Sequence, residues 1–237
     1  MDSFRLIYVL ISAILFSVLM TFVVNFHNSK EKFVRSIIKA IIVALIVIPV
    51  YALIFFAQNV QQATLIDTLY FIGTDWMAYY VFKFSFQFTG FGKIPRRYYK
   101  YCISLIIVDT ISLLINNFTH HSFFLQYSYT SYDFPYWSLN LTPFHYIHLG
   151  LCYIMVLSSL AVLFIAAKKA PYYYKSKFWC IFVAYILIIV TNLICYSMDL
   201  PVDISILLYG ILAAYCTYFS AFKAPHQMIL HILNTIN

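Results

Sequence analysis

The chain has 237 residues, of which 63% are apolar and 10% are charged, and its mean hydropathy is +0.84. Soluble domains are usually about 45–50% apolar, so the composition excludes an ordinary soluble protein and predicts one that resides in a membrane. The formal net charge of +7 comes from short basic clusters beside apolar runs, where anionic lipid headgroups are natural partners, so it does not indicate nucleic-acid binding.

Seven apolar runs follow one another along the chain, each of roughly 19–24 residues and so long enough to cross a hydrocarbon core of about 30 Å as a helix. In chain order they are Leu6–Phe26, Ile37–Ala57, Leu65–Phe88, Tyr99–Asn117, Phe144–Ala167, Phe178–Ser197 and Ile204–Phe222. The sequence therefore predicts an all-α membrane protein, a bundle of seven transmembrane helices.

Lysine and arginine cluster after every second run, and therefore on one side of the membrane. They follow the first, third, fifth and seventh runs, as Lys30, Lys32, Arg35 and Lys39, then Lys93, Arg96, Arg97 and Lys100, then Lys168, Lys169, Lys175 and Lys177, and finally Lys223. The opposite loops carry Asp133, Asp199 and Asp203, and the only basic residue on that side is Arg5. Short basic loops stay in the cytoplasm, so we predict an outer N-terminus and a cytoplasmic C-terminus.

The longest connection, Phe118–Pro143, joins the fourth and fifth runs on the predicted outer side. Its centre, Phe123–Trp137, alternates aromatic and polar residues before an Asp-Phe-Pro turn, which predicts a short β-hairpin. Tyr136 and Trp137 close this segment, and together with Tyr127, Tyr129 and Tyr132 they could form a lid over a ligand pocket between the third to seventh spans. The alternative is an aromatic belt at the membrane surface.

Two carboxylates lie near the middle of predicted spans, Asp75 in the third and Asp109 in the fourth. An ionisable group at this depth costs at least ~2.5–3.5 kcal/mol, so it should face the protein interior. The pair could bind a cation, share a proton, or hydrogen-bond Thr74 and Thr110. Protonated carboxyls that simply bridge helices are the alternative. Trp76, next to Asp75, is a further candidate ligand-binding residue.

Four histidines fall near the predicted outer surface: His120, His121, His145 and His148. His145 and His148 are three residues apart, so they should share one helix face. Two hypotheses for these histidines are a zinc site completed by Asp133 and a pH sensor. Hydrogen bonding at the interface suits the same residues, and we predict no metal and no cofactor.

The cysteines Cys102, Cys152, Cys180, Cys195 and Cys216 are never closely paired, which predicts free, buried thiols.

The third, fourth and fifth runs carry motifs of a known family. The third ends in Phe86-Gln87-Phe88-Thr89-Gly90, the fourth ends in Leu113-Leu114-Ile115-Asn116-Asn117-Phe118-Thr119-His120-His121, and the fifth opens with Pro143-Phe144-His145-Tyr146-Ile147-His148 and continues Tyr153-Ile154-Met155-Val156-Leu157. In order and spacing this resembles the N-terminal seven-helix sensor region of bacterial histidine kinases and related diguanylate cyclases. The resemblance implies a signal-sensing module of the bacterial cytoplasmic membrane, without catalysis of its own, that binds a small ligand or peptide from the outer side.

Other seven-helix classes fit the sequence less well. A retinal protein needs a lysine in its last span, and Ile204–Phe222 has none. Transporters usually interrupt helices with glycine or proline at mid-membrane. In this sequence only Pro49 is an interior proline, so the function of a small transporter ranks second, as the alternative to sensing.

The C-terminal residues suggest how a signal would leave the membrane. We expect residues 1–224 to form the sensor domain and residues 225–237 to begin a cytoplasmic signalling helix. In Gln227–Ile236 the apolar residues recur at helical spacing. The resemblance implies a homodimer through this helix, whereas an interfacial helix resting on membrane lipids is the alternative. No output domain follows within the chain, so we expect one on a longer chain or on a separate partner.

Overall fold

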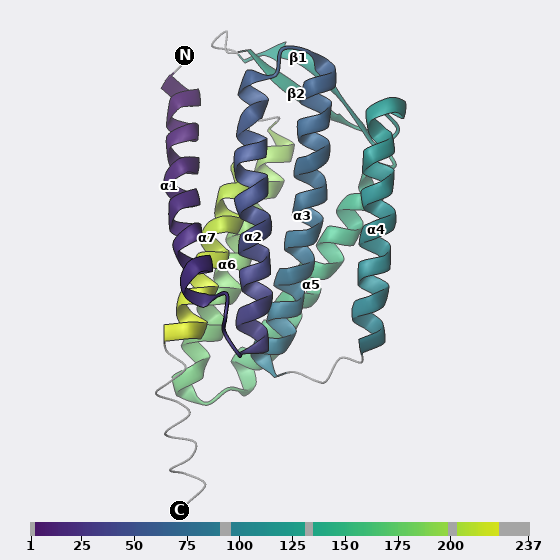
Figure 1. Cartoon of the computed structure of the whole chain (residues 1–237). Helices are drawn as coiled ribbons and strands as arrows, with labels where there is room; N and C mark the ends of the chain where they lie inside the picture. The colour runs from purple at the N-terminus through teal and green to yellow at the C-terminus, as the bar shows by residue number, and fades with distance from the viewer. Residues whose placement is uncertain (1–2, 91–95, 131–134, 199–202, 223–237) are drawn as a thin grey trace, which may run out of the picture.

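The computed structural model describes residues 3–90, 96–130, 135–198 and 203–222. These residues form seven α-helices, one 3₁₀ helix and one β-hairpin (Figure 1). In chain order the elements are α1 (Ser3–Phe26), α2 (Lys32–Ala52), η1 (Leu53–Phe56), α3 (Val60–Thr89), α4 (Arg96–Thr119), β1 (Phe123–Tyr129), β2 (Pro135–Leu141), α5 (His145–Lys169), α6 (Tyr172–Ser197) and α7 (Ser205–Phe222). All seven predicted runs are therefore helical. The predicted signalling helix at 225–237 lies outside the described residues.

The helices differ in their suitability for crossing a membrane. Five segments are long and apolar enough: Arg5–Phe26, Lys32–Phe56, Arg97–Thr119, His145–Lys169 and Lys175–Cys195. Helix α3 is 30 residues long but includes Asp67, Asp75 and Lys83, and α7 offers a shorter apolar segment, Ser205–Tyr218. The protein is thus a multi-pass membrane protein, while seven crossings and the orientation of the two ends stay predictions.

Side chains on the outside of the bundle are as apolar as those inside. Ile14, Val108 and Ile154 are 65–66% exposed, as expected of side chains that contact lipid tails. Inside, α2 and α3 lie side by side at the centre (Figure 1), with Ile37, Ile41 and Phe84 fully buried.

The approach of α2 to α3 depends on one glycine. A Cβ atom at Gly73 would lie 2.0 Å from Cγ2 of Val47, far inside van der Waals contact. Residue 73 therefore has to lack a side chain for these helices to pack as they do. Helix α3 itself begins where the Asn59 side chain accepts a hydrogen bond from the Gln62 N–H at 2.9 Å, and it ends at Gly90 in the left-handed conformation.

The predicted hairpin is confirmed, and it extends further than its aromatic centre. Strands β1 and β2 pair antiparallel from Phe123 opposite Leu141 to Tyr129 opposite Pro135. The hairpin lies across one end of the bundle, from α4 towards the start of α1 (Figure 1). It is attached to α1 by Arg5, whose guanidinium donates a hydrogen bond to the Pro135 carbonyl at 3.2 Å.

Candidate functional site

A cluster of polar side chains joins α3, α4 and α5 inside the bundle. His148 Nδ1 lies 2.8 Å from Oδ2 of Asp109 and 3.5 Å from Oδ1 of Asp75. The Cys152 thiol donates a hydrogen bond to the same Asp75 oxygen at 2.9 Å. Asp75 is fully buried and His148 is 3% exposed. We call Asp75, Asp109, His148 and Cys152 the carboxylate–histidine cluster.

Helix geometry explains how the sequence brings these groups together. His148 and Cys152 are four residues apart on α5, so they project from one face. Asp75 lies in the middle of α3, which packs against both α4 and α5. A charged imidazolium between the two carboxylates would leave one negative charge in excess. In addition, Oδ2 of Asp75 has no hydrogen-bond partner among the described residues.

Aromatic contacts fix the orientation of the two α5 histidines. The ring of Phe71 from α3 packs edge-on against His145 and His148, with centroid distances of 4.7 and 5.3 Å. The two histidine rings are 4.9 Å apart, which confirms that they share a helix face. His145 is fully buried, and its Nδ1 lies 3.1 Å from the Ser122 hydroxyl at the start of the hairpin.

Asn116 connects this region to the hairpin. Its side-chain oxygen accepts hydrogen bonds from the N–H groups of Ser122 (2.7 Å) and Phe123 (3.2 Å), and its amide donates to the Phe123 carbonyl at 3.0 Å. Asn116 is fully buried. It thereby fixes the end of α4 to the first residues of β1, next to His145.

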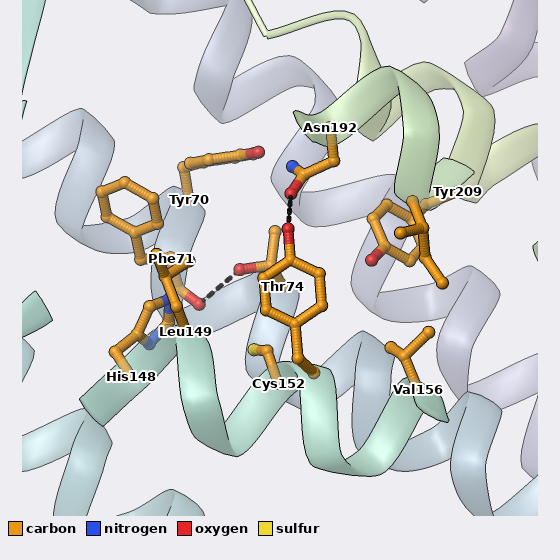
Figure 2. Close-up of a pocket in the computed structure, with 11 residues that line it drawn as sticks. Tyr70, Phe71, Thr74, His148, Leu149, Cys152, Val156, Asn192 and Tyr209 are labelled. Carbon is orange, nitrogen blue, oxygen red and sulfur yellow. Dashed lines mark hydrogen bonds between the residues drawn. The ribbon is translucent and has the colours of Figure 1, made fainter. Parts of the chain in front are cut away.

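A cavity of about 40 Å³ lies beside the cluster (Figure 2). It is lined by residues of α3, α5, α6 and α7: Tyr70, Phe71, Thr74, His148, Leu149, Cys152, Tyr153, Val156, Ile189, Asn192 and Tyr209. The cavity lies where the sequence predicts a pocket, among the third to seventh spans. The volume is enough for a few water molecules or a small ion.

A chain of hydrogen bonds runs around this cavity from helix to helix. The Tyr153 hydroxyl donates to the Asn192 side chain at 2.8 Å, and the Asn192 amide donates to the Ser205 hydroxyl at 3.2 Å. The Ser205 N–H then donates to Asp203 at 2.8 Å, and Asp203 accepts a hydrogen bond from the Tyr70 hydroxyl. This hydrogen-bond chain connects α5, α6, the start of α7 and α3.

The hairpin aromatics line a different cavity from the one predicted. Tyr127, Tyr136 and Trp137 border a cavity of about 120 Å³ whose other wall is formed by Arg5 and the η1 region. Tyr129 is 61% exposed, and Tyr132 lies outside the described residues. The expectation that these aromatics cover the cavity between the third to seventh spans is therefore wrong for those described. The hairpin extends back towards α1 instead of over α6 and α7.

The other predicted site residues lie apart from the cluster. Trp76 packs edge-on against Tyr79, with centroids 6.2 Å apart. His120 is exposed and ends α4 with a positive φ of 51°. His121 folds back onto α4, where its Nε2 lies 2.9 Å from the Ser112 hydroxyl and its Nδ1 lies 2.6 Å from Thr119. The four histidines thus do not form one site, and Asp133 lies outside the described residues.

Two expected hydrogen bonds to the buried carboxylates are also absent among the described residues. The Thr74 hydroxyl donates to the Phe71 carbonyl of its own helix at 2.8 Å, and the Thr110 hydroxyl has no partner there. The carboxylates are bound by His148 and Cys152 instead. Sequence reasoning missed Cys152, Tyr153, Asn192 and Ser205; the four-residue spacing between His148 and Cys152 was the one available signal. The five cysteines form no disulfide among the described residues; Cys195 and Cys216 are buried and the other three are half-buried.

A helical bundle that is apolar outside and has a buried polar cluster inside defines a polytopic membrane protein. The family model for the N-terminal 7TM region of histidine kinases matches residues 8–223. The chain belongs to this family of membrane sensor regions. A comparison with curated proteins finds no match.

Proposed function

We propose that the chain receives a signal from the outer side of a bacterial cytoplasmic membrane and transmits it through a change in helix packing around the 40 Å³ cavity. The hydrogen-bond chain Tyr153–Asn192–Ser205–Asp203–Tyr70 carries this proposal, because it couples the cavity to α7. Helix α7 is the last described element before the segment that would lead to an output domain.

The size of the cavity supports a two-state response. A ligand larger than a few water molecules cannot enter without separating α3, α5, α6 or α7. A ligand shifts an equilibrium only by its difference in affinity for the two states. A small polar ligand that replaces one hydrogen bond of the chain would favour a different packing of α6 and α7.

The strength of a single bond in the hydrogen-bond chain also suits a change in the two-state equilibrium that can be measured. A net contribution of about 1 kcal/mol for one neutral hydrogen bond corresponds to roughly a fivefold change in a two-state equilibrium. The loss or gain of one such bond is thus enough to alter output measurably.

The type of output and the assembly also belong to this proposal. Family membership favours a histidine kinase over a diguanylate cyclase and favours sensing over transport. Such a kinase would act as a homodimer, paired through residues 225–237, which lie outside the described residues. The basic residues Lys168 and Lys169 at the end of α5 would contact anionic lipid headgroups on the cytoplasmic side.

The experiment uses the chain fused in frame to the catalytic segment of a histidine kinase, in membranes. Tyr153→Phe removes one hydroxyl from the hydrogen-bond chain, and Tyr101→Phe removes one from the exposed side of α4. We expect Tyr153→Phe to change basal autophosphorylation about fivefold in either direction, and Tyr101→Phe to leave it unchanged. Equal output from both variants, at equal membrane levels, would contradict the proposed function.

A further inference from the structure

The carboxylate–histidine cluster combines the donor types of a transition-metal site. One thiol, one imidazole and one carboxyl group, from Cys152, His148 and Asp75, offer ligand atoms that all lie within 4.8 Å of one another. Asp109 lies outside this group of three, but its Oδ2 is 2.8 Å from His148 Nδ1, so a side-chain movement would bring it to the same ion. We propose that Asp75, Asp109, His148 and Cys152 bind one divalent transition-metal ion of the zinc type.

The distances suit such an ion after small movements. Ligand atoms at about 2.0–2.3 Å from a tetrahedral zinc lie roughly 3.3–3.8 Å from one another. In the cluster, His148 Nδ1 is 3.5 Å from Asp75 and 2.8 Å from Asp109, and Cys152 Sγ is 2.9 Å from Asp75. Side-chain shifts of about half an ångström would therefore bring these three pairs of atoms to the separations expected around zinc.

Charge and burial favour a cation at this position. The described ion pairs of Asp75 and Asp109 are both with His148, so one imidazolium at most balances two carboxylates. The second carboxylate oxygen of Asp75 is buried without a hydrogen-bond partner among the described residues. Buried charges are stable when they are paired or coordinate a metal. A divalent ion with two carboxylates and one thiolate leaves one net negative charge, as an imidazolium with two carboxylates does, but the ion would bind the charged donors directly. Binding would release the thiol proton, and any second imidazole proton, to water.

The donor set selects the class of metal. Thiolate and imidazole ligands suit zinc and cobalt, whereas magnesium and calcium prefer sites built of oxygen alone. His148 and Cys152 project from one helix face, the arrangement in which paired ligands on a helix bind zinc. Both also line the adjacent 40 Å³ cavity, which has room for a water molecule as a further ligand.

A bound ion would hold α4 in place. Among the helices, α4 packs mainly on α3. Asp109 is the residue of α4 that belongs to the carboxylate–histidine cluster. Coordination would join α3, α4 and α5 at one point. Metal binding is a property of the cluster alone; its use as the sensed signal, or as a structural support of the sensor, rests on the proposed function.

The test uses the full chain, purified in detergent and treated with a chelator, and titrated with Co²⁺ under reducing conditions. We expect one Co²⁺ per chain, a thiolate-to-cobalt absorption band, and displacement of Co²⁺ by Zn²⁺ but not by excess Mg²⁺. Cys152→Ser should remove the band, while Cys102→Ser, a matched change on α4, should retain it. Asp109→Asn should weaken binding by at least about 10–100-fold, with helicity checked by circular dichroism.

Other results would overturn the inference. One is a failure of the unmodified chain to bind Co²⁺ stoichiometrically, and the other is a thiolate-to-cobalt band that persists in Cys152→Ser. If cobalt fails to bind while Tyr153→Phe still changes kinase output, the metal site is wrong and the proposed function stands. If cobalt binds as expected and Tyr153→Phe has no effect, the metal site stands and the proposed function is wrong.

Discussion

His148 Nδ1 and Asp109 Oδ2 lie 2.8 Å apart, and this contact joins α5 to α4 inside the bundle. Asp75 Oδ1 lies 3.5 Å from the same imidazole nitrogen. One histidine therefore fixes the relative positions of three helices. The stability of this part of the bundle should depend on the charge and hydrogen-bonding capacity of Asp109.

We predict that Asp109→Leu destabilises the protein by roughly 3–5 kcal/mol, because it leaves the buried His148 with neither the charge nor the hydrogen-bond acceptor that Asp109 supplies. Asp109→Asn should cost only about 1 kcal/mol, since the amide oxygen can still accept a hydrogen bond. Thermal unfolding in detergent measures both. Ser104→Ala is the control, because the Ser104 hydroxyl bonds only the carbonyl of Lys100 in its own helix. Equal stability of the leucine and asparagine variants would show that the hydrogen bond to His148 contributes little.

Two glycines provide a matched test of helix packing. Gly73→Ala places a Cβ 2.0 Å from Val47 Cγ2, so we expect a loss of about 1–3 kcal/mol from overpacking. Gly150→Ala meets no atom within 4 Å and should be neutral or stabilising, because alanine favours the helix by up to about 1 kcal/mol. Val47→Ala combined with Gly73→Ala should recover part of the loss. If Gly73→Ala is as stable as Gly150→Ala, the described approach of α2 to α3 is wrong.

The hairpin should lose its anchor when Asn116 is replaced. Asn116→Leu leaves the N–H groups of Ser122 and Phe123 without their acceptor, at a cost of about 1–3 kcal/mol for each buried group. We expect faster amide hydrogen exchange across β1, measured by mass spectrometry. In contrast, Asn117→Leu should leave β1 unaffected, because the Asn117 side chain donates to Leu114 of its own helix and accepts from Thr68 of α3, and neither residue belongs to the hairpin. Unchanged exchange in Asn116→Leu would mean that other contacts hold the hairpin.

The predicted orientation can be tested by cysteine labelling in intact cells with a membrane-impermeant reagent, in a background without native cysteines. A cysteine at Tyr129, exposed on the hairpin, should be labelled from outside. One at Lys175, exposed near the start of α6, should be labelled only after the cells are opened. The reason is the confinement of basic loops to the cytoplasm. Labelling of Lys175 from outside would reverse the topology and place the hairpin inside.

Much of the fold was predictable because helix length and aromatic alternation are local properties of the sequence. The runs from Leu6–Phe26 to Ile204–Phe222 are all helical, and Phe123–Trp137 falls within the hairpin. The helix rotations were not predictable, because lipid-facing and core-facing side chains are equally apolar in a membrane bundle. Hydropathy therefore could not show that α4 turns Asp109 towards His148.

The same limit explains the incomplete site. Asp75, Asp109 and His148 were candidates by residue type, since ionisable groups within spans should face the interior. Their meeting through one imidazole depends on tertiary packing, as does the involvement of Cys152. Tyr153 and Asn192 were not recognised as partners, because their contact joins residues of two different helices.

The central claim is that the hydrogen-bond chain around the cavity controls output as one unit, and a double-mutant cycle on autophosphorylation tests it most directly. Tyr153→Phe and Ser205→Ala remove groups from opposite sides of the Asn192 side chain. In the fused kinase, the double variant should change output little more than either single variant, a coupling of about 0.5–3 kcal/mol. The pair Tyr153→Phe and Ser104→Ala should be additive. Additive effects of Tyr153→Phe and Ser205→Ala, or no effect of either, would contradict the account.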